Sequence, residues 1–377
     1  MSGVTTGRHR LTSSVLVKVA SSACNMKCTY CFYREKKIVG QDGPLHRMNE
    51  AVLEALIQQV MGHTEGPVNI AWQGGEPTLI GLEQFEKIVS LQKKYGYPGQ
   101  IVSNAIQTNG LLLNMDWIHF FSRYNFLVGL SLDGPARHHD TYRLTKDGQP
   151  TFSRVYPKIR MLQQGNIAFN LLVVLNRRTV RHPEELYNFL IDNGIRYVQF
   201  IPAVEQEKSG RLARFSMEEE RYGRFLCTLF DLWFNGGHPR ISVRMFDSLL
   251  GFLLTGEQGL CFFKRDCGDH LVVEVDGSVY TCDFFVNKRW RLGNILEQPL
   301  WQLEKSHVRE SFSRRKANLP EQCQCCKWRK FCYGGCPKYR VFTSPNHMCN
   351  GYKQFFEYAV PILQRSLPQG NRTTSQY

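Results

Sequence analysis

The sequence predicts an α/β fold, in which a partial, TIM-like (β/α)6 barrel is followed by a smaller domain with a β-hairpin and many cysteines. Between residues 14 and 234, six short apolar runs alternate with six segments of helical periodicity. Such alternation is typical of parallel strands joined by right-handed crossovers. The alternation stops near residue 236, and nine of the 13 cysteines lie between residues 261 and 349. We therefore expect one domain over 1–235 and another over 236–377.

The predicted barrel strands are short runs rich in β-branched and aromatic residues. In chain order they cover residues 14–20, 67–73, 100–110, 125–134, 168–176 and 197–202. The helices are predicted at 49–61, 82–95, 114–123, 153–164, 182–193 and 216–234. In barrels of this kind the chemistry takes place where strands end and loops begin, so functional residues are sought there.

Length and composition are those of a globular protein. With 377 residues, 42% of them hydrophobic, the chain can bury a large core. No apolar run approaches the roughly 18 to 20 residues of a membrane span. The segment "RHRLTSSVLVKVASSA" has the outline of a signal peptide, but Lys18 interrupts its apolar part, so an opening strand is the better interpretation. We therefore expect a cytoplasmic protein with no membrane partner, whose cysteines bind metal rather than form disulfides.

The formal net charge of +14 raises the question of nucleic-acid binding. Lys and Arg are scattered, however, in short groups such as "NRR" at 176–178 and "SRRK" at 313–316. Thiolates bound to anionic clusters would also cancel part of the formal charge. We therefore expect a basic, solvated surface and no nucleic-acid partner.

Three cysteines follow the first predicted strand, in the segment "CNMKCTYC" with the spacing C-x3-C-x2-C. Cys24, Cys28 and Cys31 form an uneven trio, whereas structural zinc sites close with four ligands. Iron–sulfur clusters take thiolates at such short spacings, and an iron without a protein ligand can bind a substrate or cofactor. The trio therefore predicts an iron–sulfur cluster with one open position.

Unusual residues stand at the ends of the next strands. "WQGGEPTL" ends the second strand with Gly74, Gly75 and Glu76, and the two glycines allow the backbone to approach a ligand closely. "QTNG" and "SLDGP" end the third and fourth strands. Each turn alone is common. Their placement at successive strand ends indicates a shared binding site.

The second half carries the remaining cysteine motifs. "LVVEVDGSVYTCD" predicts a β-hairpin with an Asp276-Gly277 turn that presents Cys282 and Asp283. "CQCCKWRKFCYGGC" contains C-x2-C-x5-C-x3-C. A pair of zinc knuckles would fit this local spacing but not the N-terminal trio. Cys227 and Cys325 fall outside these patterns and are expected to be bystander thiols.

The trio with Tyr30 before its last cysteine, followed by "GGEP", resembles the radical S-adenosylmethionine (SAM) superfamily. The resemblance covers nearly the whole chain. It implies that the open iron binds the methionine part of SAM and that reductive cleavage yields a 5′-deoxyadenosyl radical. It also implies a role in SAM binding for Gly74, Gly75 and Glu76 at the methionine amino group, Ser131 and Arg143 at the carboxylate and ribose, and Tyr30 at the adenine.

The cysteines of the second half resemble those of a SPASM domain, which holds two auxiliary clusters. The resemblance implies one cluster on Cys261, Cys267, Cys282 and Cys336. It implies another on Cys323, Cys326, Cys332 and Cys349. Together with the trio, this gives three [4Fe–4S] clusters.

Among SPASM proteins, the segments "CNMKCTYCFYREK", "WQGGEPTL", "SLDGPARHHDTYR", "QFIPAVE" and "YTCDFF" most resemble anaerobic sulfatase-maturating enzymes. These oxidise a Cys or Ser of a sulfatase polypeptide, in an unfolded Cys/Ser-x-Pro-x-Arg segment, to Cα-formylglycine. The resemblance implies that Asp283 is the catalytic base and that Tyr33 and Gln73 line the peptide pocket. It also implies an electron donor such as flavodoxin or ferredoxin.

Two alternatives stay open at this point. One is a SPASM maturase that installs a thioether or carbon–carbon crosslink in a ribosomal precursor peptide. The other is a non-catalytic metal- or RNA-binding protein. The segment 204–220, "VEQEKSGRLARFSMEEE", has no clear counterpart in the family and could shape the peptide entrance. The target polypeptide, the preference for Cys or Ser and the oligomeric state are not fixed by the sequence.

Overall fold

A curved sheet of ten strands, in the order β10-β9-β8-β1-β2-β3-β4-β5-β6-β7, organises the protein. The computed structural model describes residues 11, 14–33, 47–64, 66–340 and 345–367. The six predicted barrel strands are present and parallel: β1 (Ser14–Val17), β2 (Val68–Trp72), β3 (Val102–Thr108), β4 (Leu127–Ser131), β5 (Phe169–Leu175) and β6 (Tyr197–Pro202). The partial (β/α)6 barrel is thereby confirmed.

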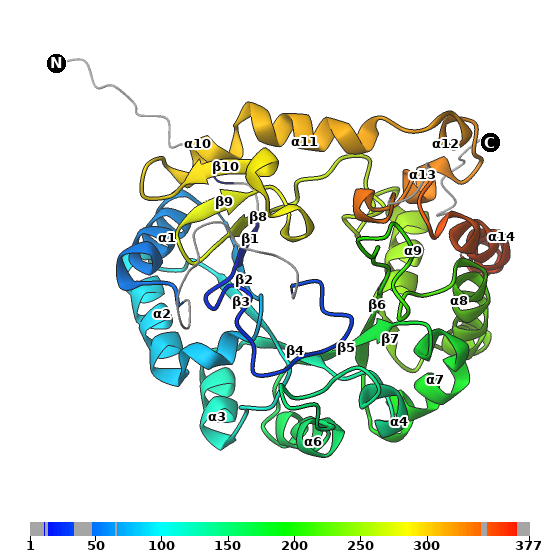
Figure 1. Cartoon of the computed structure of the whole chain (residues 1–377), viewed down its shortest axis with the longest axis horizontal. Helices are drawn as coiled ribbons and strands as arrows, with labels where there is room; N and C mark the ends of the chain where they lie inside the picture. The colour runs from blue at the N-terminus through cyan, green and yellow to red at the C-terminus, as the bar shows by residue number, and fades with distance from the viewer. Residues whose placement is uncertain (1–10, 12–13, 34–46, 65, 341–344, 368–377) are drawn as a thin grey trace.

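Helices cover the outer face of this curved sheet (Figure 1). They are α1 (Glu50–His63), α2 (Leu82–Tyr95), α3 (Met115–Arg123), α4 (Ala136–His139), α5 (Phe152–Val155), α6 (Pro157–Gln164), α7 (Pro183–Asp192) and α8 (Glu219–Phe234). The helix expected over 153–164 is divided into α5 and α6. Pro157 stands at the division, where its missing N–H cannot continue the helical hydrogen bonds.

The sequence suggested that the alternation of strand and helix stops near residue 236, but in the structure it continues. A short strand β7 (Ser242–Val243) pairs in parallel with β6, and α9 (Arg244–Thr255) follows it. The strand was missed because two residues give no measurable periodicity. The division into domains at residue 235 stays a prediction.

The C-terminal part extends the opposite edge of the sheet. Strand β8 (His270–Val273) pairs in parallel with β1, and β9 (Ser278–Tyr280) and β10 (Arg291–Asn294) add antiparallel strands. The β8–β9 hairpin turns at Asp276-Gly277 as predicted, and Gly277 has φ +80°. The remaining helices are α10 (Leu300–Glu304), α11 (His307–Ala317), α12 (Glu321–Gln324), α13 (Arg329–Cys332) and α14 (Cys349–Ser366). The last of them, α14, packs beside α8 (Figure 1).

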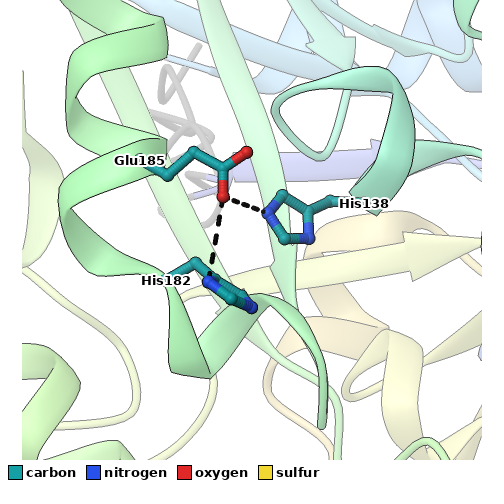
Figure 2. A group of neighbouring side chains, drawn as sticks. All are labelled: His138, His182 and Glu185. Atoms are coloured by element: carbon teal, nitrogen blue, oxygen red, sulfur yellow. Dashed lines mark hydrogen bonds and ion pairs between the residues drawn. The ribbon is translucent and has the colours of Figure 1, made fainter.

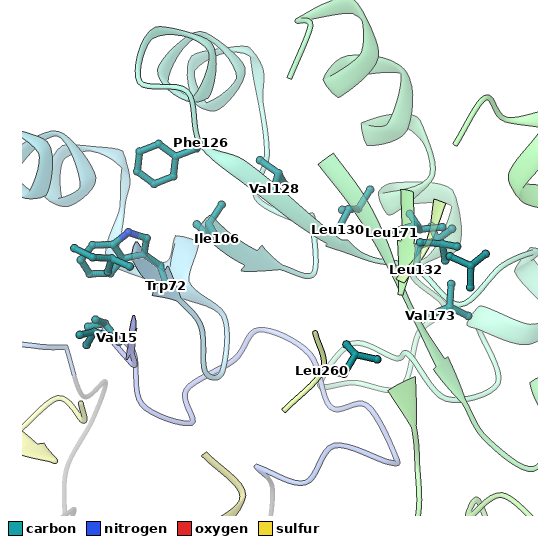
Figure 3. Close-up of a cluster of buried hydrophobic side chains, with 14 of the residues drawn as sticks. Val15, Trp72, Ile106, Phe126, Val128, Leu130, Leu132, Leu171, Val173 and Leu260 are labelled. Atoms are coloured by element: carbon teal, nitrogen blue, oxygen red, sulfur yellow. The ribbon is translucent and has the colours of Figure 1, made fainter. Parts of the chain in front are cut away.

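A continuous hydrophobic core lies between the sheet and the helices (Figure 3). Trp72 and Phe126 are almost completely buried, and Phe85 of α2 contacts both aromatic rings edge-on. Aromatic pairs of this geometry are stabilised beyond the area they bury. The core fixes the positions of the strands, and so also the positions of the loops at their carboxyl ends.

No helix among the described residues is long and apolar enough to cross a membrane.

Candidate active site

The cysteine trio lies in the loop that follows β1, at the carboxyl ends of the barrel strands. Burial raises the pKa of the Cys24 thiol to about 12 and that of Cys28 to about 11, and the nearby Cys31 contributes to both increases. None of the three is in a disulfide. Three soft donors in one loop, with no fourth cysteine near them among the described residues, would fit an iron–sulfur cluster that leaves one iron open.

The paired glycines pack directly against this loop. Gly74 and Gly75 have positive φ angles, +101° and +46°. A Cβ on Gly75 would lie 2.0 Å from the carbonyl oxygen of Ala23, a distance that no side chain tolerates. The next amide, of Glu76, donates to the same Ala23 oxygen at 2.8 Å. The turn therefore needs glycine at position 75, because its backbone packs against Ala23, the residue before the first cysteine.

The carboxylate of Glu76 is fully buried and holds neighbouring strand ends together. One oxygen accepts from the Thr78 amide and from the hydroxyl groups of Thr78 and Thr108, and the other accepts from the Asn109 amide at 2.7 Å. Asn109 in turn donates to the Cys24 sulfur at 3.6 Å. Thr108 and Asn109, part of the "QTNG" turn, thus connect the second and third strands to the cysteine loop.

A second buried carboxylate, Asp133, organises the residues expected near the adenosine part of SAM. The Tyr30 hydroxyl donates to Asp133, and the Arg143 guanidinium forms an ion pair with it at 3.1 Å. Asp133 also accepts from the Val174 amide at 2.9 Å. Ser131 is buried at the end of β4. Tyr30 and Arg143 are therefore brought together by a residue that the motif "SLDGP" contains but that sequence reasoning did not select.

Asp283, Tyr33 and Gln73 meet although they come from three separate parts of the chain. Asp283 is 5% exposed and begins a short 3-10 helix after β9. The Tyr33 hydroxyl donates to Asp283 Oδ2, and the Gln73 amide donates to Tyr33 Oη at 3.3 Å and to Asp283 Oδ2 at 3.5 Å. The predicted base and the two predicted pocket residues thus form one hydrogen-bonded group beside the cysteine loop.

Sequence reasoning missed an ion pair that supports this group. Lys18 and Glu274 are fully buried, with Lys18 Nζ 2.5 Å from Glu274 Oε1. The ammonium also lies 3.6 Å from Asp283 Oδ1 and 4.8 Å from the centre of the Tyr33 ring. The available signal was a lysine inside an apolar strand, which has to find a partner when it is buried.

The eight auxiliary cysteines form two groups whose members interact electrostatically. The first group comprises Cys261, Cys267, Cys282 and Cys336. The second comprises Cys323, Cys326, Cys332 and Cys349. These are the two sets implied by the resemblance. The second group lines a cavity with Trp328, Tyr352 and Phe356, whose apolar walls fit a buried cluster. Of the other two thiols, Cys325 is exposed and Cys227 is partly buried on α8.

A more open cavity is lined by residues that follow Cys31 and Asp283 in the chain. Phe32, Phe284, Glu205 and Lys338 line it, together with Phe285, Arg315, Pro337 and Arg340. Glu205 forms an ion pair with Lys338, so the 204–220 segment contacts the C-terminal half at this cavity. The same segment reaches the SAM side, where Phe215 contacts the ring of Tyr30 edge-on.

A cluster of His138, His182 and Glu185 joins α4 to the beginning of α7 (Figure 2). Glu185 Oε2 lies 2.9 Å from His138 Nε2 and 3.8 Å from His182 Nδ1. Arg137 pairs with the same carboxylate oxygen, and the buried His138 Nδ1 has no hydrogen-bond partner among the described residues. Arg137 thus forms an ion pair with Glu185 and His138 a hydrogen bond, and these contacts connect α4 to α7.

The fold and the cysteine sets define a radical SAM protein with an auxiliary-cluster domain. Residues 19–190 match the radical SAM superfamily model, and residues 261–327 match SPASM, described as an iron-sulfur cluster-binding domain. The alternatives of zinc knuckles and of a non-catalytic metal- or RNA-binding protein are thereby wrong. The chain is a peptide-modifying radical SAM oxidoreductase.

Its relatives narrow this class. The chain is 38% identical to a cysteine-type anaerobic sulfatase-maturating enzyme of Clostridium perfringens, over 93% of this chain and 97% of the relative. It is 36% identical to a serine-type enzyme of Bacteroides thetaiotaomicron, over 93% and 90%. The chain belongs to the family of anaerobic sulfatase-maturating enzymes.

Solved structures agree with this assignment. The structure of anSMEcpe with bound AdoMet and the Cp18Cys peptide superposes with a TM-score of 0.87 at 38% identity, covering 94% of this chain and 98% of that one. Streptococcus suis SuiB bound to its precursor peptide SuiA gives a TM-score of 0.63 at 14% identity and shares the fold alone.

We expect Gly75→Ala to weaken SAM binding about tenfold or more, because the new Cβ has to push Ala23 and the cysteine loop away. The measurement is the SAM dissociation constant of the cluster-loaded protein. Gly81→Ala is the matched control, since Gly81 also has a positive φ, +89°, but has no atom within 4 Å of the added Cβ. Equal losses in both variants would show that backbone strain alone is responsible.

Proposed function

We propose that this protein oxidises a cysteine or serine of a sulfatase polypeptide to Cα-formylglycine. The observation that carries the proposal is the group of Asp283, Tyr33 and Gln73, which holds a carboxylate beside the cysteine loop. The neighbours of this group in the chain, Phe32 and Phe284, line the open cavity. Membership of the anaerobic sulfatase-maturating family supports it.

The reaction needs three separate removals. For a cysteine, one hydrogen atom leaves Cβ, one proton leaves the thiol and one electron leaves the substrate, which gives a thioaldehyde. Water then replaces sulfide and yields the aldehyde. When bound, SAM and the iron–sulfur clusters supply the hydrogen-abstracting radical and an acceptor for the electron.

In this scheme Asp283 takes the proton from the substrate thiol or hydroxyl. Tyr33 and Gln73 hold Asp283 Oδ2 and so fix the direction of the carboxylate. A base held in this way acts with little loss of orientation. Phe32 and Phe284, whose ring centres are 5.0 Å apart, contribute apolar surface to the open cavity.

The residues expected to hold SAM surround the cysteine trio. Gly74 and Gly75 present backbone groups for the methionine amino group, as Glu76 fixes the turn. Arg143, Ser131 and Tyr30 would serve the carboxylate, ribose and adenine. Arg143 is fully buried beside Asp133, so its charge is kept in place for an anionic or polar ligand.

Eleven cysteines in sets of three, four and four support three [4Fe–4S] clusters. A reduced flavodoxin or ferredoxin would supply the electron for SAM cleavage, and a basic surface suits such acidic partners. Unfolded sulfatase segments with a Cys/Ser-x-Pro-x-Arg motif would be the substrate, met in the cytoplasm before folding.

The proposal is tested with a short peptide that contains Cys-x-Pro-x-Arg, incubated anaerobically with dithionite and SAM. We expect the peptide to exchange sulfur for oxygen with loss of two hydrogens, to release sulfide and to react with hydrazine reagents. Mass spectrometry and the amount of 5′-deoxyadenosine are measured together. Deoxyadenosine without aldehyde would contradict the proposed substrate, and loss of hydrogen with retention of sulfur would indicate a crosslinking maturase instead.

The cluster count is tested by replacing Cys24, Cys28 and Cys31 with alanine together. We expect the reconstituted wild type to hold about twelve irons and the triple variant about eight, because the two auxiliary sets remain. SAM cleavage should be abolished. Cys227→Ala is the control and should keep the full iron content. A triple variant that still cleaves SAM would refute the role of the trio.

The role of Asp283 is tested with Asp283→Asn, which keeps the shape of the side chain but removes the base. We expect formylglycine formation to fall by about 10² or more, the usual contribution of a positioned base. Iron content and deoxyadenosine formation should stay at wild-type levels. Undiminished aldehyde in this variant would assign Asp283 a structural role.

A further inference from the structure

Lys18 is a buried cation placed between two carboxylates. Its side chain and that of Glu274 are fully buried, and Nζ lies 2.5 Å from Glu274 Oε1 and 3.6 Å from Asp283 Oδ1. Among the described residues, Glu274 Oε2 has no hydrogen-bond partner. Burying charges is costly, and apolar residues can often replace a buried pair without loss of stability. A role beyond stability therefore has to be sought for this pair.

Strand register places Lys18 beside Glu274. Strands β1 and β8 pair in parallel with Val17 opposite Val273, and the Lys18 amide donates to the Val273 oxygen at 2.9 Å. Lys18 and Glu274 are the residues that directly follow the two strands. A slip of the register by one residue would turn one of the two side chains to the opposite face.

The loop after β2 makes room for the lysine. A Cβ on Gly74 would lie 2.8 Å from Lys18 Cε and 2.9 Å from its Cγ. The side chain therefore passes directly under the glycine turn on its way to Asp283. Gly74 thus has a second structural purpose besides any contact with SAM.

The lysine contacts two members of the group that contains the proposed base, Asp283 and Tyr33. Tyr33 and Gln73 hold Asp283 Oδ2, while Lys18 faces Oδ1 and lies 4.8 Å above the Tyr33 ring. Glu274 takes the shorter contact with the ammonium. Lys18 is therefore shared between the two carboxylates, and its ion pair with Glu274 is closer than its ion pair with Asp283.

We propose that the Lys18–Glu274 pair is a positioning device for the oxidation: Lys18 orients the Asp283 carboxylate toward the substrate, and Glu274 keeps Lys18 from pairing fully with Asp283. The inference rests on the proposed function. Asp283 follows β9 of the C-terminal part, whereas Tyr33 and Gln73 follow β1 and β2. The pair lies where the two parts join and sets their relative position at the proposed base.

The test compares wild type with Lys18→Met/Glu274→Leu, which removes both charges together and leaves neither buried and unpaired. We expect full iron content, SAM cleavage as in the wild type and an unchanged KM for the peptide. The kcat for aldehyde formation should fall by about 10²-fold, the effect of a misplacement of about 1 Å. Aldehyde per deoxyadenosine therefore falls, which a purely structural role would not cause.

Glu274→Gln is measured beside it and retains the lysine. Without the Glu274 charge, Lys18 is free to pair with Asp283, so this variant should also form less aldehyde per deoxyadenosine. The control, Glu54→Leu/Lys94→Met, removes an exposed pair between α1 and α2 whose atoms are 2.7 Å apart and should change nothing.

The outcomes separate the two proposals. Absence of aldehyde from the wild type would refute the proposed function. Aldehyde from the wild type, with an unchanged ratio in Lys18→Met/Glu274→Leu or, should that variant fail to fold, in Glu274→Gln, would refute the positioning role and leave the function intact.

Discussion

The parallel pairing of β1 with β8 is the contact on which the site depends. β1 opens the barrel and leads into the cysteine loop, while β8 begins the hairpin that leads to Cys282 and Asp283. The two strands are about 256 residues apart in sequence. Their register places the predicted base, Asp283, beside the cysteine loop of the predicted SAM cluster. The Lys18–Glu274 pair directly follows the paired residues of the two strands.

Buried carboxylates hold the loops at the strand ends together, in addition to the apolar contacts of the core. Glu76 connects the ends of β2 and β3, and Asp133 connects Tyr30, Arg143 and the amide of Val174. Each carboxylate accepts several hydrogen bonds, which offsets the cost of burying its charge. A site built in this way is rigid before any ligand binds, and preorganisation of this kind is what radical chemistry needs to avoid side reactions.

The C-terminal half contributes more than clusters. Its first cysteine group stands beside Asp283, since Cys282 immediately precedes it, whereas the second group is enclosed by Trp328, Tyr352 and Phe356. Glu205 and Lys338 join the 204–220 segment to this half at the open cavity. The segment that the sequence left unexplained therefore lies at the cavity and also contacts Tyr30.

The sequence by itself determined the parts of this protein that depend on local pattern. Alternating apolar runs predicted β1 to β6, and the spacing of Cys24, Cys28 and Cys31 predicted an open cluster, because strand periodicity and ligand spacing are properties of adjacent residues. The strand β7 was not predicted, because its two residues are too few to show a periodic pattern. The partners of Lys18 and Glu76, and the meeting of Asp283 with Tyr33, were decided only by the tertiary structure. Apart from the local contact of Glu76 with Thr78, these contacts join residues far apart in sequence, and strand register, which no local pattern encodes, sets which of them meet.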